Sequence, residues 1–170
     1  MREWQTALHT YITAAPNDRR TIMWIVDTAG GAGKSCFCRH VCMQHPSVPY
    51  VRTGKSSDIA QYMRSLHEAK GPPSPNCILI DVPRDHLKYI QYSNIEAWRD
   101  GHIFSGKYES VGIWLNYPKI IVFANDWPNP LSLSRDRWKV WELDGKQDWT
   151  EYTLAEDGQW QPEDSEAEED

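Results

Sequence analysis

The residue types best suited to chemistry gather in a glycine-rich segment, TAGGAGKS, at residues 28–35. Glycines allow a backbone whose successive N–H groups point at one anion, and a helix that starts there adds the positive end of its dipole. Lys34 is then expected to reach the β- and γ-phosphates of a nucleotide, and the Ser35 hydroxyl to bind Mg²⁺. The segment therefore predicts a phosphate-binding loop, or P-loop.

This loop departs from the pattern GxxxxGK[ST] at one position, where Thr28 stands in place of the first glycine. We expect the double glycine Gly30-Gly31 to supply the backbone freedom that the first glycine of the pattern would give. An ordinary glycine-rich turn followed by a chance Lys-Ser pair is the alternative interpretation. The residues that the pattern assigns to the nucleotide are Gly30, Gly31, Ala32, Gly33, Lys34, Ser35 and Cys36.

Two further polar side chains follow apolar runs that are typical of buried strands. Asp81 ends the run CILID, and beside a P-loop such a carboxylate is placed to hold Mg²⁺, through water or together with Ser35. Asn125 follows the run IIVFA, where its amide is suited to orient the water that attacks the γ-phosphate. A solvated strand end and a turn-forming Asn are the corresponding alternatives.

Three of the four cysteines lie within the segment CFCRHVC, at residues 36–42. On a helix the pairs Cys38–Cys42 and Cys36–His40 take different faces, and the chain has no paired CxxC knuckle. The pattern therefore favours free thiols on a core-facing helix over a metal site. Reduced thiols are typical of an intracellular compartment.

The elements that must position these residues alternate between helices and short apolar strands. Hydrophobic periodicity predicts helices over 3–14, 34–44 and 57–69, the last capped by Ser57 or Asp58, and helical turns up to residue 100. Strands are expected over 21–26, 48–51, 77–82, 120–124 and 138–143, with a β-hairpin over 101–115. We expect Trp24, Trp98 and Trp114 to fill the core or the packing of the hairpin.

This alternation indicates an α/β fold with a mainly parallel central sheet in a three-layer P-loop domain. A short N-terminal helical segment and an inserted β-hairpin complete the expected architecture. Ligands of such sheets bind at the carboxyl ends of the strands, where the polar residues described above are expected to meet.

The net charge of −6 belongs to the C-terminal segment. Residues 151–170 hold nine acidic residues and no Lys or Arg, which leaves residues 1–150 with 18 basic and 15 acidic residues, a net charge of +3. A mildly basic body permits nucleic-acid binding without requiring it. The longest apolar runs are too short to span a membrane, and the N-terminus lacks the pattern of a signal peptide.

The order of the motifs resembles the superfamily 3 helicase domain of replication-initiator (Rep) proteins from small circular single-stranded DNA viruses. The matching segments are GGAGKS (Walker A), CILIDVPRD (Walker B), DGHIFSGKYES (B′) and IIVFAN (motif C), and SLSRDRWKV is similar to the family's arginine-bearing segment. The sequence DVPR after the Walker B strand, with KYE in B′, is most similar to the nanovirus-like branch. The resemblance covers about residues 1–143.

This resemblance implies a modified AAA+ fold that assembles into hexameric rings, with ATP and Mg²⁺ at subunit interfaces and single-stranded DNA in the central channel. It implies ATP hydrolysis to ADP coupled to 3′ to 5′ movement along DNA during rolling-circle replication, in the nucleus of a host cell. Arg137, with Arg135 as the second choice, is expected to act on a neighbour's ATP. Lys107, at a hairpin tip that also holds Ser105 and Tyr108, is expected to contact DNA phosphates.

Rep proteins of this family also carry an N-terminal nickase domain with a His-hydrophobe-His metal motif and a nucleophilic Tyr. We find neither here, so we expect a helicase fragment that does not nick or rejoin DNA by itself. The implied organisation is a helical oligomerisation segment over 1–20, the helicase ATPase domain over 21–150, and an acidic tail over 151–170 that is disordered from about residue 161.

The group that polarises the attacking water stays open, because Val82 stands where many such ATPases have a second acid after the Walker B Asp. Asp81 itself, Asp85, Glu96 and Asp126 are the candidates. Two other functions also remain open: a P-loop nucleoside or nucleotide kinase, and a non-catalytic oligomerisation module that holds nucleotide as a structural ligand. ATP hydrolysis with and without single-stranded DNA separates the three.

Overall fold

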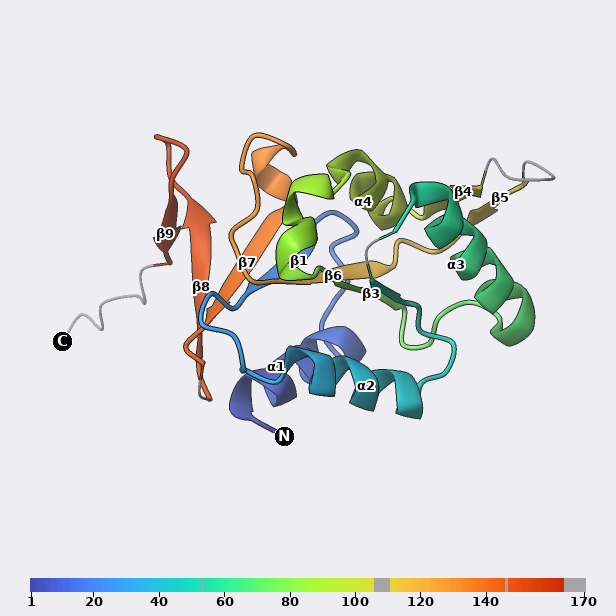
Figure 1. Cartoon of the computed structure of the whole chain (residues 1–170), viewed down its shortest axis with the longest axis horizontal. Helices are drawn as coiled ribbons and strands as arrows, with labels where there is room; N and C mark the ends of the chain where they lie inside the picture. Colours follow the sequence, from blue (N-terminus) through green and yellow to red (C-terminus); the bar gives the residue numbers. More distant parts are fainter. Residues whose placement is uncertain (53, 106–110, 146, 164–170) are drawn as a thin grey trace.

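Seven strands form one central sheet in the computed structural model, which describes residues 1–52, 54–105, 111–145 and 147–163 (Figure 1). The strand order is β2-β3-β6-β1-β7-β8-β9, in which the first five are parallel and the last two are antiparallel to their neighbours. The predicted α/β class with a mainly parallel sheet is therefore confirmed. The bounds are Ile22–Val26 for β1, Tyr50–Arg52 for β2, Cys77–Asp81 for β3, Lys119–Ala124 for β6, Trp138–Leu143 for β7, Trp149–Leu154 for β8 and Trp160–Pro162 for β9.

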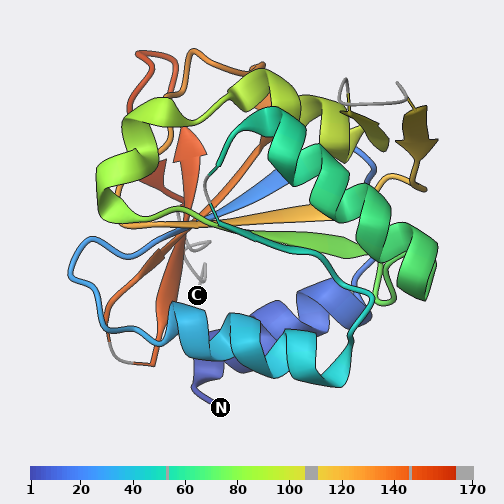
Figure 2. The same ribbon diagram turned by 45° about the vertical axis from the view of Figure 1, so that its right-hand side comes forward.

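Helices cover both faces of this sheet (Figure 1, Figure 2). α1 (Glu3–Thr13) and α2 (Lys34–Gln44) lie on one face, and α3 (Ser56–Lys70) and α4 (Tyr92–Arg99) lie on the other. Because side chains alternate along a strand, β1 contributes Trp24 to the core under α3 and α4, and its neighbours to the core under α1 and α2. All residues of β1, β3 and β6 are buried, as expected for strands covered on both faces.

Most predicted elements are found close to their expected bounds, with two local differences. β2 begins at Tyr50 rather than at Val48. α3 begins at Ser56 and no side chain caps its N-terminus, so the prediction that Ser57 or Asp58 caps this helix is wrong. Both residues lie inside the first turn, where a short polar side chain no longer has the non-helical backbone that an N-cap needs.

A separate two-stranded ribbon, β4 (His102–Ser105) and β5 (Val111–Trp114), confirms the predicted hairpin. The tip, residues 106–110, lies outside the described residues. The side chain of Trp114 is 72% exposed and stacks on His102, with 4.4 Å between ring centroids. Trp114 therefore packs within the hairpin, and Trp24 and Trp98 are buried in the core, as expected.

The acid-rich C-terminal segment is part of the sheet up to residue 162. β8 and β9 extend the sheet beyond β7, so the expected boundary at residue 151 falls inside β8. Aromatic rings hold this extension: Trp149 stacks on Trp141 at 5.2 Å, and Trp160 meets Trp138 edge-on at 5.7 Å between centroids. The prediction of disorder from residue 161 is wrong for 161–163, and residues 164–170 lie outside the described part.

The N-terminal helix packs within the same unit. α1 buries Trp4, Leu8 and Ile12 in the core that it shares with α2 and the sheet. Its apolar face is thus covered by its own chain, and a role of residues 1–20 in oligomerisation stays a prediction. Among the described helices, none combines the length and the apolar character that crossing a membrane requires.

Arg99, at the end of α4, ties the starts of two central strands together. Its side chain is fully buried, and its guanidinium donates to the carbonyl oxygens of Thr21 (2.7 Å), Tyr117 (2.8 Å) and Pro118 (3.0 Å). Nη2 also donates to the carboxylate of Asp18 at 2.9 Å. The cation therefore satisfies backbone carbonyls just before β1 and β6, two of the three strands that carry polar site residues at their carboxyl ends.

We expect Arg99→Leu to lower the free energy of unfolding by roughly 3–5 kcal/mol, because removing one member of a buried charged network leaves its partners unsatisfied. Urea unfolding followed by circular dichroism measures the change. Arg39→Leu, on the exposed face of α2, is the matched control. Equal stability of the two variants would show that Arg99 does not anchor the strands.

Candidate functional site

The carboxyl ends of three neighbouring parallel strands meet at one edge of the sheet. β6 lies between β1 and β3, and polar residues follow each strand: Asp27 follows β1, Asn125 follows β6, and Asp81 ends β3. An open pocket of about 470 Å³ lies at this edge. Its lining residues are Gly31, Gly33, Lys34, Ser35, Cys36, Arg52, Asp81, Val82, Pro83, Arg84 and Asn125.

The loop between β1 and α2 has a backbone that only glycines adopt with ease. Gly30, Gly31 and Gly33 have φ angles of 79°, 77° and 92°, in the left-handed region. A Cβ atom added to Gly30 would also stand 2.7 Å from Nη2 of Arg84. The loop therefore needs these glycines both for its conformation and for the close approach of an arginine.

The carboxylate of Asp27 organises the interior of this loop. It is fully buried and accepts hydrogen bonds from the backbone N–H groups of Gly30 (2.9 Å) and Ala32 (3.3 Å). Nζ of Lys34 donates to the same carboxylate at 2.6 Å, and the Lys34 side chain is only 11% exposed. Burial alone would raise the pKa of Asp27, but the bond and charge of Lys34 outweigh it, so this pKa lies below its usual value.

Side chains of α1 and of Arg2, the residue just before it, hold the loop from outside. Three of them donate to three successive carbonyl oxygens: Arg2 Nη1 to Gly31 (3.2 Å), Trp4 Nε1 to Ala32 (3.2 Å) and Gln5 Nε2 to Gly33 (3.1 Å). These three hydrogen bonds fix the loop's backbone against the N-terminal segment. This clamp could not be predicted from the sequence, because the helix periodicity of residues 3–14 shows only which residues are apolar.

Asp81 and Asn125 are each fixed by one neighbour. The Tyr50 hydroxyl, on the adjacent strand β2, donates to Oδ2 of Asp81 at 2.6 Å. Burial and this bond to the carboxylate both raise the pKa of Tyr50. Asn125 donates through Nδ2 to the carbonyl oxygen of Asp27 at 2.9 Å, which ties the end of β6 to the start of the loop. Among the described residues Oδ1 of Asp81 has no hydrogen-bond partner, so it is available to a ligand.

The predicted nucleotide residues divide into two groups. Gly31, Gly33 and the run Lys34–Cys36 line the pocket. Gly30 and Ala32 do not line it, because their N–H groups turn toward the Asp27 carboxylate. The structure thus brings Lys34, Ser35, Asp81 and Asn125 together, as the sequence predicts.

Two arginines that the sequence analysis missed line the same pocket. Arg52 ends β2 and Arg84 starts η1 (Arg84–Tyr89), the 3₁₀ turn after β3, and both side chains are exposed. Within the described part of the chain, no hydrogen bond or ion pair occupies either guanidinium. With Lys34 they place three cations around one pocket, which suits a polyanion. The signal for Arg84 was the segment DVPR, which places this arginine three residues after the end of β3.

The structure does not support Arg137 as a residue that reaches a neighbouring subunit. It is 3% exposed and its guanidinium pairs with Asp100 at 3.0 and 3.2 Å and with Glu96 at 3.3 Å. Arg135 is exposed, but its guanidinium donates to the carbonyl oxygens of Leu154 and Ala155. Arg137 therefore has an internal structural role, and Arg135 becomes the better candidate of the two.

Of the four acids considered for water activation, only Asp81 lines the pocket. Glu96 pairs with Arg137, and Asp126 accepts a hydrogen bond from the N–H of Trp127. Among the described residues, no three His, Cys, Asp or Glu side chains gather as a metal site. Cys38 is buried on α2, as expected for a core thiol, whereas Cys36 is exposed at the pocket.

The predicted DNA contacts fall largely outside the described residues. Lys107 and Tyr108 belong to the hairpin tip, and the structure describes only the backbone of Ser105, the last residue of β4. Their role stays a prediction.

Fold and site together define a class: an α/β chain with a glycine loop and three cations shaped for a polyanion at the ends of parallel strands. No protein-family model matches the chain. Among curated proteins, the chain is 31% identical over 142 residues to the master replication protein of subterranean clover stunt virus (strain F), which covers 81% of this chain and 46% of that protein.

Two more relatives match the chain at similar identity. The chain is 35% identical over 120 residues to the master replication protein of faba bean necrotic yellows virus (isolate Syrian SV292-88), covering 71% of this chain and 38% of that protein. It is 34% identical over 138 residues to Para-Rep C1 of Faba bean necrotic yellows C11 alphasatellite, covering 81% and 45%. The chain is thus homologous over most of its length to viral replication proteins, and spans less than half the length of these relatives.

We expect Asp27→Asn to lower the free energy of unfolding at neutral pH by roughly 2–4 kcal/mol, because it leaves the nearly buried Lys34 cation without its counter-charge. Since the pKa of Asp27 is lowered by folding, its contribution is present above its unfolded pKa of about 4 and is lost as pH falls through the lower folded pKa. The difference between wild type and variant should therefore shrink below about pH 4.

Urea unfolding at a series of pH values measures this difference. Asp157→Asn, in an exposed turn, controls for the loss of a carboxylate. A wild-type advantage that stays constant down to pH 2 would contradict the pairing of Asp27 with Lys34.

Proposed function

We propose that the chain is the ATP-hydrolysing motor domain of a viral replication-initiator protein, and that it moves along single-stranded DNA. The observation that carries the proposal is the convergence of Lys34, Asp81 and Asn125 on one pocket at the ends of three parallel strands. Homology to master replication proteins supports a role in rolling-circle replication.

The residues of the pocket fit a nucleoside triphosphate and Mg²⁺. The glycine backbone of the loop lets the polyphosphate approach closely, and Lys34, Arg52 and Arg84 supply three positive charges for it. Ser35 and the free oxygen of Asp81 are the residues that would hold Mg²⁺, which neutralises phosphate charge when bound. Lys34 would exchange the Asp27 carboxylate for a phosphate oxygen.

In the proposed reaction, water attacks the γ-phosphorus and the bond to the β–γ bridging oxygen breaks, releasing ADP, inorganic phosphate and a proton. Asn125, held by Asp27 at the end of the middle strand, is placed to orient this water. Arg52 and Arg84 can stabilise, from within the same subunit, the charge that develops on the phosphoryl group. Asp81 is the acid at hand to polarise the water.

A second candidate, a nucleotide-binding module without catalysis, is favoured by one observation. Val82 follows Asp81, and Asp81 is the only one of the four candidate acids in the pocket. Such a module would bind ATP but would not turn it over. Transfer of phosphate to a nucleoside, rather than to water, would instead identify the chain as a P-loop kinase.

Exposed aromatic rings on the hairpin support the DNA part of the proposal. Trp114 is 72% exposed and Phe104 is 54% exposed, and both neighbour the His102 ring at 4.4 and 6.3 Å. Exposed rings of this kind stack on bases of any sequence, as a translocating protein requires. Lys107, in the tip between them, would add a phosphate contact that carries no base identity.

The last part of the proposal concerns the assembly of several copies of the chain. By resemblance to superfamily 3 helicases we propose a homo-oligomeric, hexameric ring in which the hairpins line a channel for single-stranded DNA, with 3′ to 5′ movement. Arg135 is then the candidate to reach a neighbour's ATP. The host nucleus is the proposed site of action.

We expect Lys34→Ala to lower ATP turnover about 100-fold or more while the chain stays folded, because Lys34 is the cation of α2 that lines the pocket. Asp81→Asn should reduce Mg²⁺-dependent turnover more than nucleotide binding. Phosphate release and isothermal titration with ATP measure the two effects. Lys70→Ala, an exposed cation at the end of α3, is the control.

Near-normal turnover by a folded Lys34→Ala protein would refute ATP hydrolysis at this pocket. Nucleotide binding by wild type without any turnover would select the non-catalytic module.

We expect Trp114→Ala and Lys107→Ala both to weaken binding of single-stranded DNA, but with different salt dependence. Loss of a stacking ring should raise the Kd roughly 5- to 100-fold and leave the salt slope unchanged, whereas loss of a phosphate contact should flatten the slope by about 0.7. Basal ATP hydrolysis should survive in both. Fluorescence anisotropy with an oligothymidylate at several salt concentrations measures both quantities.

Leu131→Ala removes another exposed apolar side chain, 89% exposed and remote from the hairpin in sequence, and serves as the control. Unchanged DNA affinity of both hairpin variants would exclude the hairpin as the DNA contact.

A further inference from the structure

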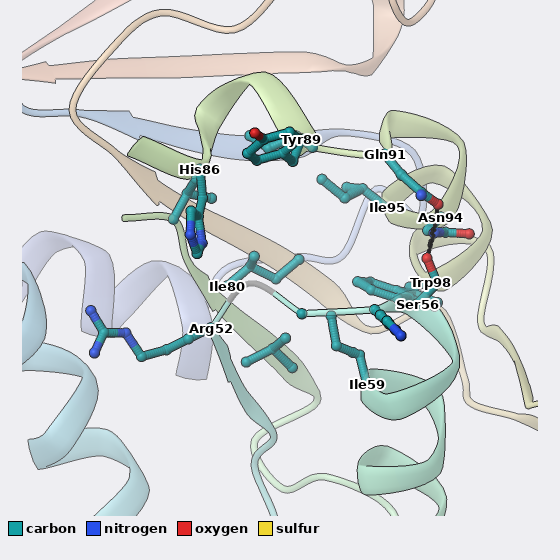
Figure 3. Close-up of a pocket in the computed structure, with 15 residues that line it drawn as sticks. Arg52, Ser56, Ile59, Ile80, His86, Tyr89, Gln91, Asn94, Ile95 and Trp98 are labelled. Atoms are coloured by element: carbon teal, nitrogen blue, oxygen red, sulfur yellow. Dashed lines mark hydrogen bonds between the residues drawn. The ribbon is translucent and has the colours of Figure 1, made fainter. Parts of the chain in front are cut away.

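The pocket described above, which holds Lys34, Asp81 and Asn125, is called the phosphate pocket here. A second pocket, of about 400 Å³, lies beside it on the α3–α4 side of the sheet (Figure 3). Arg52 and Val82 line both pockets, whereas no residue of the glycine loop lines the second one. A molecule in the second pocket would therefore be distinct from a nucleotide on the loop, and both would contact Arg52 and Val82. The volume is in the range of cavities that hold small organic ligands, roughly 300–1,000 Å³.

The walls of the second pocket are apolar and partly aromatic. Ile80, Ile95 and the nearly buried Trp98 come from β3 and α4, and Tyr89, 65% exposed, lies on one side with Ile59 on the opposite side (Figure 3). Flat and apolar surfaces that face each other favour a planar ring over a bulky or strongly charged group.

One end of the pocket carries a fixed amide pair. Asn94 Nδ2 donates to Ser56 Oγ (2.7 Å) and to Gln91 Oε1 (2.7 Å), and Ser56 Oγ donates to Gln91 Oε1 (2.8 Å). Within the described chain this leaves Oδ1 of Asn94 and Nε2 of Gln91 without a protein partner. One acceptor and one donor group of this kind match the hydrogen-bonding edge of a nucleobase.

The opposite end of the pocket is cationic. Figure 3 shows Arg52 at the end away from the amide pair, and no described residue neutralises its guanidinium. A ligand whose ring meets the amides at one end would thus present its other end to an arginine. Aromatic ring, polar edge and negative tail in this order are the features of a nucleoside 5′-phosphate.

We infer that this second pocket binds one nucleotide unit, with its base against Asn94 and Gln91 and its phosphate toward Arg52. The unit can come from a free nucleoside monophosphate or from single-stranded DNA, since both present the same chemistry. The site goes beyond the proposed ATP hydrolysis, and its occupation does not require turnover. Arg52 lines both pockets and is the register partner of Asp81. A phosphate bound to Arg52 in the second pocket would therefore change the positive charge at the phosphate pocket.

The test blocks the glycine loop with a non-hydrolysable ATP analogue and Mg²⁺, and then titrates the chain with thymidine 5′-monophosphate and deoxyadenosine 5′-monophosphate by calorimetry. A parallel arm uses an oligothymidylate of about eight nucleotides. Asn94→Leu and Gln91→Leu should each raise the Kd about five- to tenfold, because each loses one base hydrogen bond. Gln61→Leu, an exposed amide on α3, is the matched control.

The oligonucleotide arm identifies the source. Equal sensitivity of oligonucleotide and monophosphate to the two variants assigns the site to DNA, and sensitivity of the monophosphate alone assigns it to free nucleotide. Gln91 is exposed, so Gln91→Leu keeps the fold even if Asn94→Leu disturbs the contact with α3. Thermal unfolding of each variant verifies this.

Absence of saturable binding in both arms, or equal affinity of both variants and wild type, would overturn the inference. So would a concentration-dependent self-association that the variants weaken, because the occupant would then be a second copy of the chain. ATP turnover measured on the same preparations separates this failure from that of the proposed function. A chain that hydrolyses ATP and binds no monophosphate refutes the second site alone.

Discussion

The position of β6 between β1 and β3, with all three strands parallel, is the constraint on which the site depends. Parallel strands deliver their carboxyl ends to one edge, so a loop, an amide and a carboxylate from distant parts of the chain arrive together. If β6 ran the other way, Asn125 would lie at the far edge from Lys34. The buried strands and the Arg99 network before β1 and β6 maintain this order.

The glycine loop is supported from two sides. Asp27 satisfies the cation and two backbone N–H groups from within, and α1 holds three carbonyl groups from outside. This support gives the loop its shape before any ligand arrives, which lowers the entropic cost of binding. Because Asp27 pairs with Lys34, Arg52 and Arg84 are the pocket cations without an ion pair among the described residues, and the polyphosphate proposed above would compete with Asp27 for the lysine.

The two faces of the sheet hold different parts of the proposed machinery. The α1–α2 face shapes the glycine loop, whereas the α3–α4 face carries the hairpin and the second pocket (Figure 1, Figure 3). Arg52, at the end of β2, lines both pockets and so connects the two faces chemically. If the proposed nucleotide and DNA contacts are both made, Arg52 would link them directly.

The sequence by itself determined most helices and strands up to residue 143 and the three motifs. Glycines at residues 30, 31 and 33, and polar residues directly after apolar runs, are local signals, and strand ends bring them to one edge whatever the details of packing. Tertiary structure decided what depends on distant partners: that Asp27 neutralises Lys34, that Arg52 and Arg84 face the pocket, and that Arg137 is buried. The acid-rich C-terminus joins the sheet for the same reason, because its tryptophans meet aromatic partners on β7 that no local pattern reveals.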